Sequence, residues 1–126
     1  MNDTPLQVIM LPYPIALNRV YRNFNGRMVM SDDARAWKQN AAWQAKASRI
    51  KIIEHGAVSV KLTLHPKLTK GGAASKIRVD LDSIFKLAVD SLNGIAYADD
   101  KQVERLHAEI GIPVLDGGLT VEIGEL

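Results

Sequence analysis

The clearest pattern of hydrophobic and polar positions is a strict alternation over residues 57–65. Val58, Val60, Leu62 and Leu64 alternate with polar side chains at positions 59, 61, 63 and 65. Since side chains along a strand point to opposite faces in turn, this alternation predicts a half-buried β-strand. A short apolar segment at residues 7–11, which stops at Pro12 and Pro14, predicts a second strand. Alternation at residues 106–110 and 119–123, the latter after an Asp-Gly-Gly turn, predicts two more.

Two other segments have the period of a helix. In the first, Ser31 can cap the start, and Asp32 and Asp33 lie where the helix dipole favours negative charge. We expect this helix to run to about Ile53. Its apolar or small stripe comprises Ala34, Trp37, Ala41, Ala45, Ser48 and Ile52. We interpret Trp37 and Trp43 as core or interface residues rather than as base-stacking groups.

The second predicted helix is shorter and more apolar. Asp82 or Ser83 can cap its start, and we expect it to end at Asn93-Gly94, because glycine accepts the left-handed conformation that follows many helices. Positions 84, 87, 88, 91 and 92 form one stripe, and Phe85 and Val89 add another. A short helix that is apolar on two sides is either deeply buried or lies at a subunit contact.

The remaining segments connect these elements. Residues 13–30 are predicted to be irregular, with asparagine and glycine supplying turns. Residues 66–75 are predicted to be a loop that is mobile without a ligand, since few apolar side chains anchor it. The expected order is β-α-β-α-β-β, a mixed α/β (α+β) fold with helices on one face of a small mixed sheet. We expect residues 1–126 to form a single domain.

Composition narrows the class of protein. The absence of cysteine excludes disulfides and thiolate metal sites. No apolar run approaches the roughly 20 residues that cross a bilayer, so we expect a cytoplasmic protein without a membrane partner. The net charge of +2 is too small to indicate a nucleic-acid partner by itself.

The distribution of charge is more informative than its sum. No acidic residue occurs at positions 4–31 or 57–79, whereas eight basic ones do: Arg19, Arg22, Arg27, Lys61, Lys67, Lys70, Lys76 and Arg78. This segregation predicts a surface that attracts a polyanion, with the carboxylates set apart for a metal ion. A solvated surface with lysines in a loop is the alternative.

The candidate chemistry lies in residues 78–100. Asp80 and Asp82 point the same way if the backbone is extended, and Lys86 returns to the side of Asp82 if a helix begins there. With Asp99 or Asp100 they offer the oxygen ligands that suit Mg²⁺ or Mn²⁺, and such a site beside basic side chains can cleave a phosphodiester. The alternatives are that both aspartate pairs merely cap helical turns, and that Lys86 is held between Asp82 and Asp90. His55, His65 and His107 lack metal-ligand spacing and are interpreted as structural or surface residues.

Three segments together resemble the RusA family of Holliday junction resolvases. They are residues 11–22 (LPYPIALNRVYR), residues 78–86 (RVDLDSIFK) and residues 90–103 (DSLNGIAYADDKQV). The resemblance covers nearly the whole chain. One departure is Ser83, which stands where the family usually has asparagine.

The resemblance implies roles for individual residues. Asp80, Asp82 and Asp100 would bind Mg²⁺, with Mn²⁺ as a possible substitute; Lys86 would be the catalytic lysine, and Asp99 would support the site. It also implies a homodimer that places paired symmetric nicks in a four-way junction during recombination and repair. Contacts to the DNA backbone are expected from Arg19, Arg22, Lys67, Lys70, Lys76 and Arg78. The alternatives are a catalytically inactive protein that binds branched DNA, and an interaction protein whose acidic site binds no metal.

Overall fold

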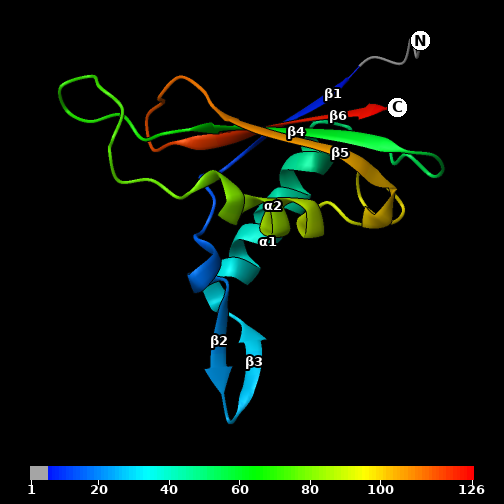
Figure 1. Cartoon of the computed structure of the whole chain (residues 1–126), viewed down its shortest axis with the longest axis horizontal. Helices are drawn as coiled ribbons and strands as arrows, with labels where there is room; N and C mark the ends of the chain where they lie inside the picture. The colour runs from blue at the N-terminus through cyan, green and yellow to red at the C-terminus, as the bar shows by residue number, and fades with distance from the viewer. Residues whose placement is uncertain (1–5) are drawn as a thin grey trace.

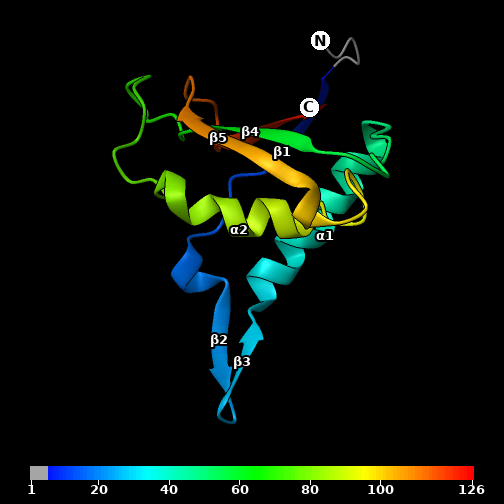
Figure 2. The same cartoon turned by 45° about the vertical axis from the view of Figure 1, so that its right-hand side comes forward.

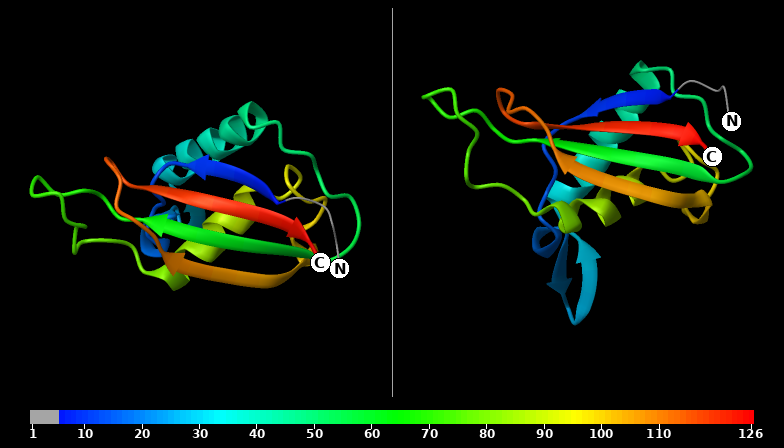
Figure 3. Two further views of the ribbon diagram at one scale, coloured as in Figure 1. Left: turned by 90° about the horizontal axis from the view of Figure 1, so that it is seen from above. Right: turned by 45° about the horizontal axis from the view of Figure 1, so that its top comes forward.

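A four-stranded sheet forms the frame of the protein. The computed structural model describes residues 6–126, so residues 1–5 of the predicted single domain lie outside the described part. The strand order is β1 (Gln7–Leu11), β6 (Gly118–Glu125), β4 (Val58–His65) and β5 (Val103–Ile110), as Figure 3 shows from above. β6 pairs antiparallel with both β1 and β4, whereas β5 pairs parallel with β4. All four strands were expected, and the mixed α+β class is confirmed.

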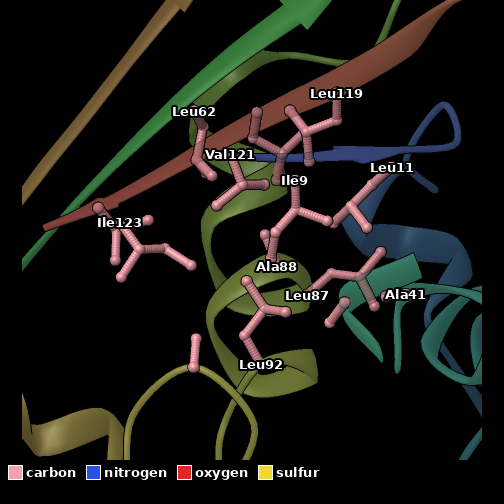
Figure 4. Close-up of a cluster of buried hydrophobic side chains, with 14 of the residues drawn as sticks. Ile9, Leu11, Ala41, Leu62, Leu87, Ala88, Leu92, Leu119, Val121 and Ile123 are labelled. Carbon is pink, nitrogen blue, oxygen red and sulfur yellow. The ribbon is translucent and has the colours of Figure 1, made fainter. Parts of the chain in front are cut away.

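Both helices, α1 (Asp32–Ala47) and α2 (Leu81–Ser91), lie against the same face of this sheet (Figures 1 and 3). The predicted alternation in β4 is confirmed, since its apolar side chains are buried and its polar ones are half-buried. The core gathers between the sheet and the helices (Figure 4). The strands contribute Ile9, Leu62 and Val121. The helices contribute Ala41 from α1 and Leu87 and Ala88 from α2, and Leu92 follows directly after α2.

Helix α1 begins as predicted and ends early. The Ser31 side chain accepts a hydrogen bond from the backbone N–H of Ala34 at 3.1 Å, which satisfies one of the free donors of the first turn. The expected end at Ile53 is wrong, because Ser48 caps the helix and Arg49 adopts a left-handed φ of 57°. The chain then turns toward the sheet. The buried stripe therefore stops at Ala45 and excludes the last two predicted members, Ser48 and Ile52.

The two tryptophans on α1 differ in environment. Trp37 is buried, and its indole N–H lies 3.1 Å from the carbonyl oxygen of Pro12 and 3.0 Å from that of Tyr13. The prediction of a core role is confirmed for this residue. Trp43 is 74% exposed and is not part of the core.

Helix α2 keeps its predicted buried stripe and shifts its start. Ile84, Leu87, Ala88, Ser91 and Leu92 are all buried. The expected caps Asp82 and Ser83 are wrong, because Asp80 occupies the capping position and Leu81 is already helical. Both the backbone N–H and the hydroxyl of Ser83 bond to the carbonyl oxygen of Asp80, at 3.1 and 2.8 Å, and this closes the first turn. The helix ends at Ser91, slightly before the expected Asn93-Gly94.

Residues 13–30 are more regular than expected. A short 3-10 helix, η1 (Leu17–Arg19), leads into an antiparallel hairpin of β2 (Tyr21–Phe24) and β3 (Arg27–Met30). Asn25 and Gly26 join the strands, with φ values of 52° and 79°. These are the positive angles of the two-residue turn that Asn-Gly favours, a signal that the irregular assignment overlooked. The hairpin projects away from the sheet and helices (Figures 1 and 2).

A second projection is formed by residues 66–80 (Figure 1). Its tip folds back on itself, since the backbone N–H of Thr69 donates to Ala73 at 2.8 Å. Its mobility without a ligand stays a prediction. No helix in the described part of the chain is long and apolar enough to cross a membrane.

The start of β1 carries a side-chain pairing. The Gln7 amide donates to the carbonyl oxygen of Lys51 at 2.8 Å and accepts from the backbone N–H of the same residue at 2.7 Å. Gln7 shares a face of β1 with the buried Ile9 and Leu11. The pairing connects the segment after α1 to the sheet.

Candidate active site

The exposed face of α2 carries a row of charged side chains at intervals of one helical turn. Asp82, Lys86 and Asp90 follow one another with a spacing of four residues, which places them on one side of the helix. The Lys86 ammonium nitrogen lies 3.2 Å from a carboxylate oxygen of Asp90. The pKa of Lys86 is raised, first by its hydrogen bond to Asp90 and by the charge of that carboxylate. The interpretation that Lys86 is held by an acid on its own helix is confirmed for Asp90.

A second pair of acids reaches this row from the loop before β5. A short 3-10 helix, η2 (Asp100–Gln102), begins there with Asp99 as its cap. The Asp99 carboxylate accepts from the backbone N–H of Lys101 at 2.9 Å, and this bond is the main cause of its lowered pKa. The Gln102 side chain accepts from the backbone N–H of Asp99 and donates to the carbonyl oxygens of Ile53 and Gly56. Asp99 therefore caps a short helical turn, which the alternative interpretation of this pair foresaw for that residue.

Asp100 lies against two other carboxylates, those of Asp99 and Asp90. Its pKa is raised, first by partial burial and then by hydrogen bonding and charge repulsion with those two residues. Asp100 also contributes to the raised pKa of Lys86. We call Asp90, Asp99 and Asp100 the carboxylate cluster. It places more negative charge in one spot than Lys86 alone can neutralise.

Two tyrosines lie near the candidate site, Tyr97 beside the carboxylate cluster and Tyr21 near Lys86. Tyr97 is fully buried and donates from its hydroxyl to the carbonyl oxygen of Val89 at 2.6 Å. Burial raises its pKa, and the charges of Asp100 and Asp90 add to the effect. Tyr21, at the base of the hairpin, lies near Lys86. Both tyrosines belong to segments that resemble the family, but the sequence interpretation gave them no role, and it treated Asp90 only as a partner of Lys86.

The other two predicted metal ligands stand apart from the cluster. Asp80 and Asp82 are exposed at the start of α2, and the Asp80 side chain makes no capping hydrogen bond. Because the helix begins at Leu81, the extended geometry that would align these carboxylates is not maintained as far as Asp82. Residues 6–126 contain no group of three or more His, Cys, Asp or Glu side chains arranged to hold a metal ion. The ligand set Asp80, Asp82 and Asp100 therefore stays a prediction.

The donor chemistry of the site nevertheless fits a divalent cation. All the acids involved are aspartates, and carboxylate oxygens are the ligands that Mg²⁺ and Mn²⁺ prefer. The raised pKa of Asp100 results in part from crowding with like charge. A cation would relieve this repulsion. The fit therefore rests on the type of donor and the local excess of negative charge, and it does not depend on a preassembled coordination shell.

The six predicted backbone-contacting residues are all exposed and lie on two parts of the chain. Arg19 and Arg22 belong to η1 and the hairpin, and Lys67, Lys70, Lys76 and Arg78 belong to the loop before α2. Figure 2 shows the start of α2 between these two projections. Four of the six contact other residues of the chain: Arg19 lies 3.5 Å from Asp33, Lys67 lies over the Tyr13 ring, Arg22 lies over the Phe24 ring, and Arg78 donates to the carbonyl oxygen of Val79 at 3.3 Å.

Replacing Asp90 by asparagine should lower the pKa values of both Asp100 and Lys86. Asp100 would lose a neighbouring like charge, and Lys86 would lose its ion-pair partner. NMR titration of the Asp100 carboxyl carbon and the Lys86 side chain would measure both shifts. Asp116→Asn, in an exposed turn before β6, is the matched control and should leave both values unchanged. An unaltered Asp100 titration in Asp90→Asn would contradict this arrangement of the cluster.

Comparison with known proteins places the chain in a family. The family model described as "Endodeoxyribonuclease RusA" matches residues 12–124. A "Crossover junction endodeoxyribonuclease RusA" of Escherichia coli O139:H28 (strain E24377A / ETEC) is 29% identical over 119 residues, which cover 94% of this chain and 93% of the relative. Proteins of the same name from Enterobacteria phage 82 and Escherichia coli strain K12 are each 31% identical over 111 residues, covering 87% of this chain and 86% of theirs. The chain belongs to the RusA family of endodeoxyribonucleases.

Proposed function

We propose that the chain is a Mg²⁺-dependent endonuclease, with Mn²⁺ as a possible substitute, that resolves four-way DNA junctions in recombination and repair. Family membership supports the nuclease activity, and the relatives' names support the crossover junction as substrate. The observation that carries the proposal is that Lys86 lies near Asp100 of the carboxylate cluster. Both residues belong to the segments that resemble the family. The start of α2, where Asp80 and Asp82 lie, is flanked by two projections that carry exposed basic side chains.

The resemblance to the family assigns a role to each residue of the proposed site. Asp80, Asp82 and Asp100 would hold the ion, which supplies a Lewis acid and an activated water. Lys86 presents a positive charge that Asp90 orients at 3.2 Å, where it can neutralise a nonbridging phosphate oxygen. Asp99 acts indirectly. Its cap and the Gln102 hydrogen bonds fix the turn that presents Asp100.

The two basic projections would position the DNA backbone. Contacts from arginine and lysine to phosphates supply affinity that falls with salt and carry no sequence information themselves. A four-way junction needs two symmetric cuts, so a twofold homodimer would place one site on each of two strands. Phe85 and Val89, the second apolar stripe of α2, are partly buried against the core of the same chain. The dimer contact that the sequence interpretation sought on α2 stays a prediction.

Cleavage of a labelled synthetic four-way junction tests this function. We expect paired symmetric nicks in the junction with Mg²⁺, none with EDTA, and none in a linear duplex of matching sequence. Salt-sensitive binding of the junction without nicks, in Mg²⁺ and Mn²⁺ alike, would favour an inactive branched-DNA-binding protein. Absence of any salt-sensitive DNA affinity would favour a protein-interaction role.

A further inference from the structure

The hairpin of β2 and β3 exposes apolar side chains that no part of the described chain covers. Phe24 is 52% exposed and Met28 is 70% exposed, and both lie within two residues of the Asn25-Gly26 turn. Exposure of such apolar side chains to water at the end of a projection is unfavourable. A two-stranded hairpin is also marginally stable by itself. The hairpin therefore has the properties of a surface that is completed by a partner.

The charges of the hairpin indicate the kind of partner. Arg22, Phe24, Arg27 and Val29 share one face, because Arg22 pairs with Val29 and Phe24 pairs with Arg27. The Arg22 guanidinium lies 5.4 Å from the centre of the Phe24 ring. Residues 21–30 contain no acidic side chain. An aromatic ring framed by two arginines is complementary to nucleic acid, where bases stack on the ring and phosphates meet the cations.

The base of the hairpin is held firmly beside the candidate active site. The backbone N–H of Ser31 donates to Val20 at 2.7 Å, and the Ser31 hydroxyl donates to Arg19 at 2.7 Å. Tyr21 and Met30 pack against the core, and Tyr21 lies near Lys86. Four strand residues from this base reach about 13 Å, which is comparable with the width of a DNA major groove. DNA held at Lys86 would therefore lie within reach of the hairpin tip.

We infer that the tip of the hairpin recognises the branch point of its DNA substrate as a wedge between unstacked bases, with Phe24 on one face, Met28 on the opposite face, and Arg22 and Arg27 beside Phe24 on the flanking phosphates. Insertion between the stacked bases of a continuous duplex requires unstacking, which costs free energy at each step. At a branch point stacking is already interrupted, so the same side chains insert at lower cost. The hairpin would thus favour junctions over duplexes. This inference rests on the proposed function and adds the residues that distinguish the two DNA forms.

The test compares binding of a synthetic four-way junction and a matched linear duplex in EDTA. In the double variant Phe24→Ala/Met28→Ala, junction affinity should fall roughly tenfold to a hundredfold. Duplex affinity should change by about twofold or less, because the phosphate contacts remain. Trp43→Ala, which removes an exposed aromatic side chain from α1, is the matched control and should leave both affinities unchanged.

A second double variant tests the contribution of the two arginine charges to binding separately from that of the inserted apolar side chains. Arg22→Ala/Arg27→Ala should weaken binding of junction and duplex together and should reduce the salt dependence by about one contact per arginine. The inference is overturned if Phe24→Ala/Met28→Ala retains the wild-type preference for the junction. It is equally overturned if that variant changes only the monomer–dimer balance in sedimentation, since the hairpin would then contact a second copy. A wild-type chain that binds no junction at all would instead refute the proposed function.

Discussion

Asp82→Asn should reduce junction nicking in Mg²⁺ by more than about a hundredfold, since even indirect supports of a metal ligand are worth roughly 10- to 100-fold. Asparagine preserves the shape of the side chain and removes the charge that would hold the ion. Junction binding should stay intact or tighten, because a negative charge near the phosphates is lost. Single-turnover cleavage and a binding titration in EDTA would separate the two effects.

Asp33→Asn is the control for this variant. Asp33 occupies the second position of α1, as Asp82 does in α2, so both changes remove the same favourable charge from a helix start. Asp33 also lies 3.5 Å from Arg19, an ion pair between exposed side chains that is worth little. The control should cleave like the wild type. Normal Mg²⁺-dependent cutting by Asp82→Asn would show that the ligand set is wrong.

Leu62→Ala should be the most damaging single truncation for the fold, costing about 2–5 kcal/mol of unfolding free energy. Leu62 is fully buried in β4, the strand that pairs with both β5 and β6, and its register partners are Ala108 and Val121. Shortening the side chain opens a cavity between the sheet and the helices. Urea unfolding followed by circular dichroism would measure the loss, and the melting temperature should fall by roughly 10 °C.

Leu106→Ala provides the comparison for that measurement. Leu106 is 42% exposed on the edge strand β5 and pairs with Val60, so the same truncation leaves a site that water already reaches. It should cost about 1 kcal/mol or less. Equal destabilisation by the two variants would mean that the core does not lie under β4.

Several parts of the fold could be predicted because their signals are local. The alternation of β4 and the stripe of α2 reflect side-chain direction within a few residues, and both are observed. The Asn25-Gly26 pair also indicates a hairpin. The prediction missed it because residues 13–30 were assigned as one irregular segment. The end of α1 had no comparable signal. Arg49 adopts a left-handed angle there, although arginine has no special preference for it.

In the candidate site, too, some features follow from local sequence spacing and others depend on tertiary contacts. The pairing of Lys86 with Asp90 and the capping by Asp99 follow from spacing, and both are present. The approach of Asp100 to Asp90 depends on tertiary contacts. Ile53 bonds to Ala96 and bridges to Tyr97, and Gln102 returns to Ile53, so the loop position is set by a segment about 50 residues away. No pattern within residues 78–100 contains that information.

The edge position of β5 has a consequence for behaviour at high concentration. Free strand edges are templates on which chains join into aggregates. The β5 edge carries Glu104, Arg105, His107 and Glu109. Charged side chains along an edge disfavour its pairing with a second chain. This edge should therefore resist extension of the sheet when the protein is concentrated.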